Sequence, residues 1–540
     1  MVWMKKRRCW VVALACLIAV GCVWGWMRYA PVWRYPQPIP FEGTPPGGTP
    51  PASPPVRQPV SYRGAPPDLA SLRAAAKGSN VVIVVLDAAR ADHFGCYGYP
   101  RDTTPNLDRL ARESLVFEQH FAQYPHTAPS TASLLTSQYP DTHGIPGAGK
   151  VGDPYMPVIG PDTFTMEQGL ASAGFGTFLF TANVHASPAV GIGTDFQQIS
   201  LVGKASPHWR GGPGRGSGRR GRRTAETARE RSLAVALLSE VQQQLDAKPS
   251  TPFFAYIHLL PPHIPYEAPP EFKALYKGKT PPGYRQGRPA FTKVAARFHA
   301  TVPPAPGPEW VNIYDANLRW GDWAVGELEA MLERAGILDD TLLLITADHG
   351  EGLREHEYEH HTSCPYDEAL HIPLLIRFPG PRRVAGRVGA LTQTVDLLPT
   401  IFDLCGVPCP KSGVQGRSLV PLLAGQTEKV NDYVFARTSG KYPCYVVHDQ
   451  HSALLLYEGG KLRALYDLDS DPGQTRNVIA EQPERAAALT RAFEAFAKTQ
   501  RYPPLHFVDP HFKPAARPKQ PQMKVSEETK RQLRALGYVQ

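Results

Sequence analysis

Long apolar runs recur along the middle of the chain. The Val- and Ile-rich run at residues 81–86 contains no polar position, which is the pattern of a strand buried on both faces. Similar runs follow at residues 253–257, 341–345 and 374–378. We therefore predict four strands of one buried sheet.

Amphipathic stripes lie between these runs. Leu237, Val241 and Leu245 are spaced four residues apart, as on one face of a helix. A second stripe advances in steps of three or four residues, and its members are Leu318, Asp322, Val325, Leu328 and Leu332. Strands that alternate with helices predict an α/β fold, with a mainly parallel sheet flanked by helices on both faces.

The first part of the chain differs from the rest. Residues 9–27 carry no charge and follow four Lys and Arg residues at 5–8, so we expect residues 1–30 to be a transmembrane anchor or a signal segment. Residues 31–67 hold 13 prolines, and we predict a Pro-rich linker over 31–77. The catalytic domain would then be membrane-anchored and exported, in a periplasmic or extracellular location, or secreted if the signal is cleaved.

The remaining chain divides once more. We predict a main domain over residues 78–427 and a smaller α+β subdomain over 428–540, where strands become shorter and turns more frequent. The run Ala19–Cys22 loosely suggests a lipid-modified cysteine as an alternative to the anchor. Of the eight cysteines, Cys405 and Cys409 form the nearest pair outside the apolar segment, but the sequence does not establish a bond between them.

The net charge of +9 does not indicate a nucleic-acid partner. Four of the cations lie at residues 5–8 and six more arginines lie in a Gly-rich stretch at 210–223. Without those ten charges the rest of the chain is close to neutral, and no recognition motif accompanies them. We interpret the arginine-rich stretch as a solvated loop.

Polar residues that could perform chemistry follow the ends of the predicted strands. Asp87 follows the first strand, Asp348 and His349 follow the strand at 341–345, and His263 follows the strand at 253–257. Open α/β sheets bind ligands beyond the carboxyl ends of their strands. Two carboxylates and one imidazole suit zinc, manganese or magnesium better than calcium. The alternative is a set of helix caps and loop histidines.

A nucleophile is the other requirement of such a site. Residues 124–136 are rich in hydroxyl side chains and open a short helix, whose free N–H groups can bind an anion. A hydroxyl that touches a divalent cation is easier to deprotonate. A Ser/Thr-rich helix cap without chemistry is the alternative.

These segments resemble the sulfatase family of the alkaline phosphatase superfamily. The opening motifs are Asp87–Asp92, Gly95–Tyr99 and Thr104–Asp108. The similarity continues, in the family's order, at Thr127–Thr136, Asp348–Glu351, Tyr366–Glu368, Val395–Thr400, Gly416–Leu419, Tyr466–Leu468, Asp471–Pro472, Asn477 and Leu533–Tyr538. The resemblance implies an alkaline-phosphatase-like sheet with a smaller C-terminal subdomain.

The resemblance also implies site residues. One divalent ion (Ca, Mg, Mn or Zn) would be held by Asp87, Thr127, Asp348 and His349. His263 and His361 resemble the family's substrate-side histidines, with possible roles in catalysis and binding, and His356 and His360 are weaker candidates in the same loop. Asn183 and Thr131 are further substrate-binding candidates.

Several departures from the family pattern affect the expected chemistry. Thr127 stands where sulfatases have the Cys or Ser that matures to formylglycine, and threonine cannot form that group, so no formylglycine is expected. Thr131 replaces an arginine, Ala88 replaces a second aspartate, and residues 180–185 lack the usual Gly-Lys-Trp-His segment. Since Gly326 stands four residues after Asp322, where two-metal relatives have a histidine, we expect one metal.

These features predict a metal-dependent hydrolase that acts on sulfuric or phosphoric esters through a Thr nucleophile. The substrate would be an ester, either a small one or one linked to a glycan or a lipid. A phosphoethanolamine- or phosphoglycerol-type transferase that modifies a lipid or glycan is the first alternative. A non-catalytic binding protein on a degenerate sulfatase scaffold is the second.

Overall fold

The computed structural model describes most of the chain beyond residue 58. The described ranges are 59–145, 155–202, 232–249, 252–282, 308–513 and part of 522–530, with short gaps at 357, 359, 382, 441–442, 460–462 and 510. All of them belong to one compact unit, Pro45–Gln540. The expected anchor or signal, most of the expected linker, the arginine-rich stretch and the closing motif lie outside the described residues. Within the described ranges, no helix combines the length and the apolar character that a bilayer crossing needs.

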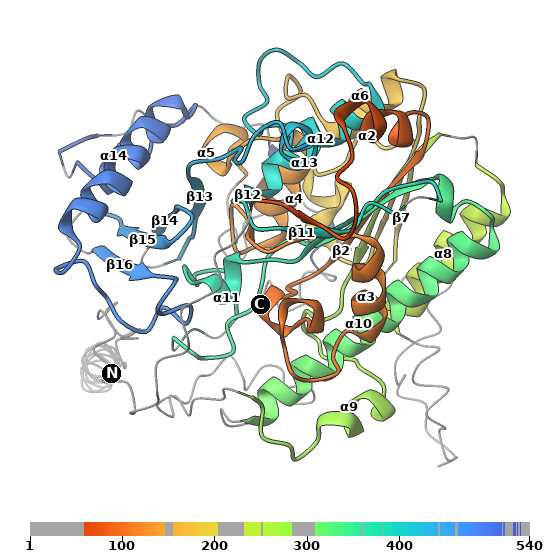
Figure 1. Cartoon of the computed structure of the whole chain (residues 1–540), viewed down its shortest axis with the longest axis horizontal. Helices are drawn as coiled ribbons and strands as arrows, with labels where there is room; N and C mark the ends of the chain where they lie inside the picture. The colour runs from red at the N-terminus through yellow and green to blue at the C-terminus, as the bar shows by residue number, and fades with distance from the viewer. Residues whose placement is uncertain are drawn as a thin grey trace, which may run out of the picture. The chain divides into compact units, whose positions relative to one another are not determined.

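A nine-stranded sheet forms the centre of the main domain (Figure 1). Its order is β1-β11-β3-β10-β9-β2-β8-β6-β7. The bounds are β1 (Ser61–Tyr62), β2 (Asn80–Leu86), β3 (Leu115–Phe117), β6 (Gly176–Thr181), β7 (Gln198–Leu201), β8 (Phe253–Leu259), β9 (Thr341–Ala347), β10 (Leu374–Arg377) and β11 (Gly386–Val388). The four strands predicted from apolar runs are β2, β8, β9 and β10, and all four are confirmed.

Strand β2 lies at the middle of this sheet. It runs parallel to β8 on one side and to β9 on the other, so that Val84 is in register with Ile257 and Ile345. Strands β6 and β7 extend the parallel part beyond β8. Strand β10 is antiparallel to both β9 and β3, and β1 is antiparallel to β11. The expected mainly parallel sheet is therefore present, and the carboxyl ends of β2, β6, β8 and β9 meet at one edge.

Helices cover both faces of the sheet (Figure 1). Successive β2 side chains point to opposite faces, so Val82 and Val84 enter one buried cluster while Val81 and Ile83 enter another. The first cluster includes residues of α3 (Pro105–Leu110), α8 (Leu233–Asp246), α9 (Pro270–Tyr276) and α10 (Pro308–Arg334). The second includes residues of α2 (Leu69–Ala76), α4 (Thr127–Thr136), α6 (Met166–Ser172), α12 (Leu397–Cys405) and α13 (Val420–Leu423).

The polar member of the α10 stripe has a structural partner. Asp322 is buried, and its carboxylate accepts N–H groups from Asn106 at 3.2 Å and from Leu107 at 2.8 Å, in the first turn of α3. Gly326 lies against Asn106, because a Cβ atom at this glycine would be 2.8 Å from the amide carbon. Asp322 therefore joins α10 to α3.

A second, smaller sheet follows at the C-terminal side. It is antiparallel in the order β13 (Val434–Arg437), β14 (Cys444–His448), β15 (Ser452–Tyr457) and β16 (Arg463–Asp467). Leu489 and Phe493 of α14 (Pro483–Thr499) pack on one face, and Tyr366 and Leu370 lie in the cluster on the other. This arrangement confirms the expected α+β character of this part.

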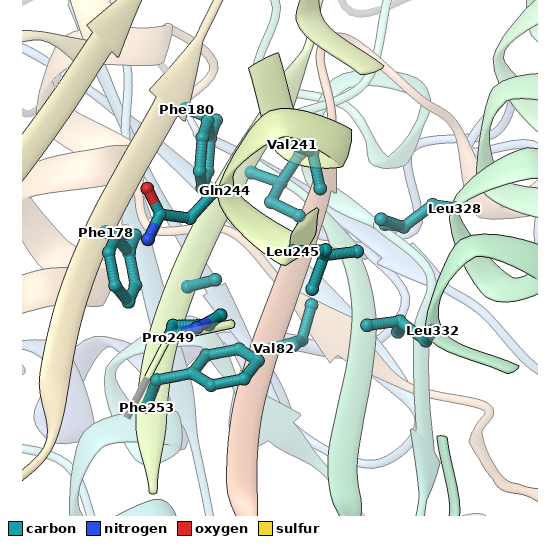
Figure 2. A pocket seen from close by; sticks show the side chains of 12 residues that line it. Val82, Phe178, Phe180, Val241, Gln244, Leu245, Pro249, Phe253, Leu328 and Leu332 are labelled. Carbon is teal, nitrogen blue, oxygen red and sulfur yellow. The ribbon is translucent and has the colours of Figure 1, made fainter. Parts of the chain in front are cut away.

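Two further features lie away from the strand ends. A small apolar cavity separates α8 and α10 from β2, β6 and β8 (Figure 2), and Gln244 is the one polar residue that lines it. Its apolar walls indicate incomplete packing rather than a site for a charged substrate.

Cys405 and Cys409 are both free thiols, so the nearest cysteine pair is not bonded.

Candidate active site and metal centre

Two neighbouring strands bring the predicted metal ligands together. Asp87 directly follows β2, and Asp348 and His349 follow β9. Because β2 and β9 are adjacent and parallel, these residues emerge at the same edge of the sheet. One ligand atom from each of the three lies within 4.8 Å of the others, and all three residues are buried.

The cluster leaves two carboxylate oxygens without a hydrogen bond. Asp87 Oδ1 lies 3.8 Å from His349 Nε2, and Asp348 Oδ2 lies 3.4 Å from the same nitrogen. Neither oxygen has a hydrogen-bond partner although both are buried. Burying such atoms unsatisfied is costly, so their convergence fits a bound cation.

The other oxygen of each carboxylate is held by donors. Asp348 Oδ1 accepts the backbone N–H groups of Ala88 at 3.1 Å and of His349 at 2.9 Å. Asp87 Oδ2 lies 2.5 Å from Asn183 Nδ2 and 3.1 Å from His258 Nε2. These contacts fix both side chains so that each presents one oxygen to the centre of the cluster.

The tautomer of His349 follows from its backbone contact. Nδ1 lies 2.8 Å from the carbonyl oxygen of Gly350, which can only accept, so we assign the proton to Nδ1. The lone pair of Nε2 then faces the two aspartates. Gly350 is required here, because a Cβ atom would lie 2.1 Å from the carbonyl oxygen of Glu368.

Thr127 supplies a hydroxyl beside this cluster. It is the first residue of α4 and is fully buried. Its Oγ1 lies 3.4 Å from His349 Nε2 and 3.4 Å from Asn183 Nδ2. The structure thus gathers the four residues expected to hold the metal, and it places the substrate-binding candidate Asn183 among them. Thr131, one helical turn further along α4, is also buried.

The two predicted substrate-side histidines lie on the same side of the cluster. The His361 ring is 4.1 Å from that of His349 and 5.2 Å from that of His263, measured between centroids. His361 Nδ1 lies 3.1 Å from Glu351 Oε1, and His263 Nδ1 bonds to the carbonyl of Ile264. Each ring is therefore oriented through Nδ1, as a general acid or base requires.

Other residues of this region were not identified from the sequence as site residues. His126 precedes Thr127, and its ring is 5.1 Å from that of His185 and 6.2 Å from that of His361. His258 and Glu351 act on Asp87 and His361 as described above. The position of His126 beside the expected nucleophile was a usable signal. His258 directly follows the predicted strand at 253–257 and Glu351 ends the motif Asp348–Glu351, so both also had a signal in the sequence, although their contacts depend on tertiary packing.

Burial and charge set the protonation of this region. Burial alone would raise the pKa of Asp87, but the charges of His263 and His258 outweigh it, and the pKa lies below its ordinary value. Burial raises the pKa of Glu351 well above the usual range, and the charge of Asp87 adds to this. Burial lowers the pKa of His185 to about 3 and that of His361 well below normal. His185 and His361 are therefore neutral imidazoles at neutral pH.

The two weaker histidine candidates lie farther out. His356 bonds to the Glu368 carboxylate and to the Gln474 carbonyl. His360 lies against Trp310, with 5.8 Å between ring centroids, and burial lowers its pKa to about 4.

A buried Asp-Asp-His cluster beside a helix-start hydroxyl, with oriented imidazoles next to it, is an arrangement typical of an ester hydrolase on an α/β sheet, and its donor atoms could hold a divalent cation. Comparison with known proteins agrees with this class. The family model described as "Sulfatase" matches residues 79–407, and the model described as "N-sulphoglucosamine sulphohydrolase, C-terminal" matches residues 355–500. The chain therefore belongs to the sulfatase family.

Individual relatives have low sequence identity to this chain, but the matches cover most of its length. The chain is 24% identical to an ulvan-active sulfatase of Formosa agariphila over 432 residues, which is 74% of this chain and 77% of that protein. It is 26% identical to arylsulfatase A of Homo sapiens, over 76% of this chain and 85% of that protein. The phosphonate monoester hydrolase of Agrobacterium radiobacter has the same fold, with a TM-score of 0.62 at 21% identity over 77% of this chain and 95% of that one. The chain is thus a sulfatase-like ester hydrolase with an alkaline-phosphatase-like fold.

Proposed function

We propose that this protein hydrolyses sulfuric or phosphoric esters with Thr127 as the nucleophile and one divalent cation as cofactor. The observation that carries the proposal is the position of Thr127 Oγ1, 3.4 Å from the imidazole nitrogen that faces the two aspartates. No other hydroxyl is needed, and no formylglycine is formed from threonine.

The donor set fits a divalent cation. Asp87, Asp348 and His349 each direct one unshared atom to a common point, and Thr127 adds a hydroxyl oxygen. Two carboxylates, one imidazole and one hydroxyl favour zinc, manganese or magnesium over calcium, which prefers shells of six to eight oxygens. A cation bound there would lower the pKa of the hydroxyl and withdraw charge from the ester oxygens.

The residues around Thr127 can carry the proton transfers. Thr127 Oγ1 forms a bond to sulfur or phosphorus while the bond to the leaving alcohol breaks. His361, oriented by Glu351, takes the hydroxyl proton, and His263 or His361 returns a proton to the leaving oxygen. Water then attacks sulfur or phosphorus in the threonine ester, which releases the inorganic acid and restores the hydroxyl.

The relatives support two candidate substrate classes. An ulvan-active sulfatase is similar to this chain in sequence, and a phosphonate monoester hydrolase has the same fold, so a sulfate ester on a glycan and a phosphorus ester are the two substrates we propose to test. A threonine ester must be resolved by attack at sulfur or phosphorus, because threonine lacks the second oxygen through which formylglycine can expel sulfate. Because Thr127 lacks that route, phosphorus esters are a candidate substrate beside sulfate esters.

Two further proposals concern the context of the enzyme. The uncharged segment at 9–27 supports an exported enzyme that is tethered to a membrane, or secreted after cleavage.

If an alcohol in place of water attacks the threonine ester, the sulfuryl or phosphoryl group passes to that alcohol and the same site acts as a transferase. Analysis of products separates these outcomes, since free sulfate or phosphate indicates hydrolysis and a modified lipid or glycan indicates transfer.

The direct experiment is a substrate screen on metal-depleted protein. Aryl sulfates, phosphate mono- and diesters and phosphonate monoesters are offered with zinc, manganese, magnesium or calcium added back. We expect turnover of at least one class, and a loss of at least about 10³-fold in Thr127→Ala. Thr136→Ala is the matched control, because it removes a buried hydroxyl of the same helix that bonds to the Ala132 carbonyl. Equal activity of Thr127→Ala and wild type would refute the nucleophile.

A further inference from the structure

The segment from Glu351 to His361 brings two site residues together and must be held in place. Glu351 and His361 form the pair that faces the metal ligands. Near its start the segment is held by Arg90, whose Nη1 lies 3.2 Å from the Glu351 carbonyl and 2.5 Å from Glu355 Oε1. The middle of the segment has a second anchor, His356.

Both ring nitrogens of His356 face acceptors. Nδ1 lies 2.8 Å and 3.1 Å from the two carboxylate oxygens of Glu368, and Nε2 lies 3.1 Å from the carbonyl oxygen of Gln474. The ring also stacks on Tyr366, with 3.7 Å between centroids and planes 5° apart. The side chain is 5% exposed, so water does not replace these contacts.

This geometry requires two protons on the ring. A backbone carbonyl can only accept a hydrogen bond, and a carboxylate is also an acceptor when ionised. A neutral imidazole would present a lone pair to one of them. His356 is therefore an imidazolium that bonds the Glu351–His361 segment to two other parts of the chain.

The groups that surround this imidazolium agree with its charge. Burial opposes the charge, but Glu368 outweighs it, and Glu355 of the same segment adds to the effect, so the pKa of His356 is raised above its ordinary value. The other groups near it are Arg90, which pairs with Glu355, the Cys364 thiol, which lies 3.5 Å from Glu368 Oε1, and the Tyr366 ring.

The helix that carries Glu368, the partner of His356, also holds the two residues that follow the metal ligand His349. Glu368 belongs to α11 (Asp367–Leu370). The Gly350 N–H donates to the carbonyl oxygen of Ala369, and the Glu351 N–H donates to that of Glu368, both at 2.9 Å. Gln474, the other partner, follows β16, and its side chain accepts the N–H of Asp367 at 2.8 Å. His356 thus connects the site segment to α11, which holds the residues that follow His349, and to the C-terminal part.

We propose that His356 is a positioning residue that, with both ring nitrogens bonded, holds the Glu351–His361 segment so that His361 stays beside the reaction centre. The proposal rests on the proposed function for its catalytic consequence, but the positioning itself can be measured without substrate. It also couples the site to pH. Both contacts are present while His356 is protonated, and one of them is lost as pH rises through its raised pKa.

Hydrogen exchange tests the positioning directly. In His356→Gln, one of the two contacts is lost, and we expect faster amide exchange in residues 351–363 with unchanged exchange in the central strands. His451→Gln is the matched control, because His451 also pairs with a carboxylate, Asp469 at 2.7 Å, but at an exposed place outside the segment. Equal exchange in the wild type and in His356→Gln would overturn the proposal, whether or not the protein hydrolyses esters.

A double-mutant cycle tests the catalytic consequence. We expect His356→Gln to lower kcat/KM by about 10- to 100-fold and to remove the alkaline decline that the wild type shows as His356 deprotonates. In a His361→Ala background the same change should have no further effect, since His356 acts through His361. If His356→Gln lowers kcat/KM by the same factor in the His361→Ala background as in the wild type, His356 does not act through His361. Glu368→Gln, which removes the charge partner, gives the same readouts if His356→Gln fails to fold.

Discussion

The hydroxyl of Thr127 is the single atom on which the proposed chemistry depends. Its position at the start of α4 places it beside His349 and Asn183. Thr127→Ser keeps the oxygen and removes only a methyl group. We therefore expect Thr127→Ser to keep kcat within about tenfold of the wild type, whereas Thr127→Ala is inactive. Steady-state kinetics on the best substrate of the screen measure this, and a serine variant as inactive as the alanine variant would contradict a simple hydroxyl nucleophile.

Glu167 is a buried acid outside the site. Both of its carboxylate oxygens lack a hydrogen-bond partner, and burial raises its pKa to about 8. The unfolded chain releases this proton at lower pH than the folded protein does, so the free energy of unfolding falls as pH rises from about 4.5 to about 8. Glu167→Gln removes the titrating group, so we expect the decrease in the free energy of unfolding between these pH values to be smaller by a few kcal/mol. The magnitude follows from about 1.4 kcal/mol for each unit by which the pKa differs between the folded and unfolded chain.

Urea denaturation at several pH values measures the effect. Glu333→Gln, a change at an exposed residue of α10, should leave the pH dependence as in the wild type. An identical slope in Glu167→Gln and wild type would show that Glu167 ionises normally in the folded protein.

At the scale of elements, the contact of Asp322 in α10 with the start of α3 should contribute measurably to the free energy of unfolding. Asp322 accepts two N–H groups at the start of α3 and pairs with Arg319 at 2.8 Å. Asp322→Ala leaves these donors without an acceptor, and we expect a loss of about 2 kcal/mol in the free energy of unfolding. Metal content should not change, because the Asp322 carboxylate is bonded to the N–H groups at the start of α3. A variant that loses stoichiometric metal would place Asp322 in a metal site instead.

The sequence predicts the buried strands well and the polar contacts between elements poorly. Strands β2, β8, β9 and β10 are visible as apolar runs because both of their faces are buried. The carboxyl ends of β2 and β9 could be paired in advance, since parallel neighbours end at one edge. This is why Asp87 and Asp348 were found together.

Other site features depend on packing that no local pattern encodes. His258 lies within β8, next to an apolar run, and its role comes from the neighbouring Asp87. Glu351 follows the metal ligands in sequence, yet its partner His361 lies ten residues further along the chain. His356 is in the same stretch and faces the opposite way, toward Glu368. Sequence spacing alone could not separate His356 from His361.

At the scale of the whole molecule, metal binding should be linked to stability. A ligand that binds only the folded protein stabilises it by RT ln(1 + [L]/Kd), about 2.7 kcal/mol at a hundredfold excess over Kd. We expect a chelator to lower Tm and zinc or manganese to restore it, while Asp348→Asn should show no restoration. Differential scanning calorimetry checks this, and a Tm that ignores both chelator and metal would argue against a bound cation.

The most direct test of the central claim is a crystal structure of metal-loaded protein with anomalous data collected at the absorption edge of the metal. The account predicts one strong peak at about 2.0–2.3 Å from Asp87 Oδ1, Asp348 Oδ2 and His349 Nε2, with Thr127 Oγ1 in the same coordination shell. A peak elsewhere, or one at the aspartates with Thr127 turned out of reach, would contradict it.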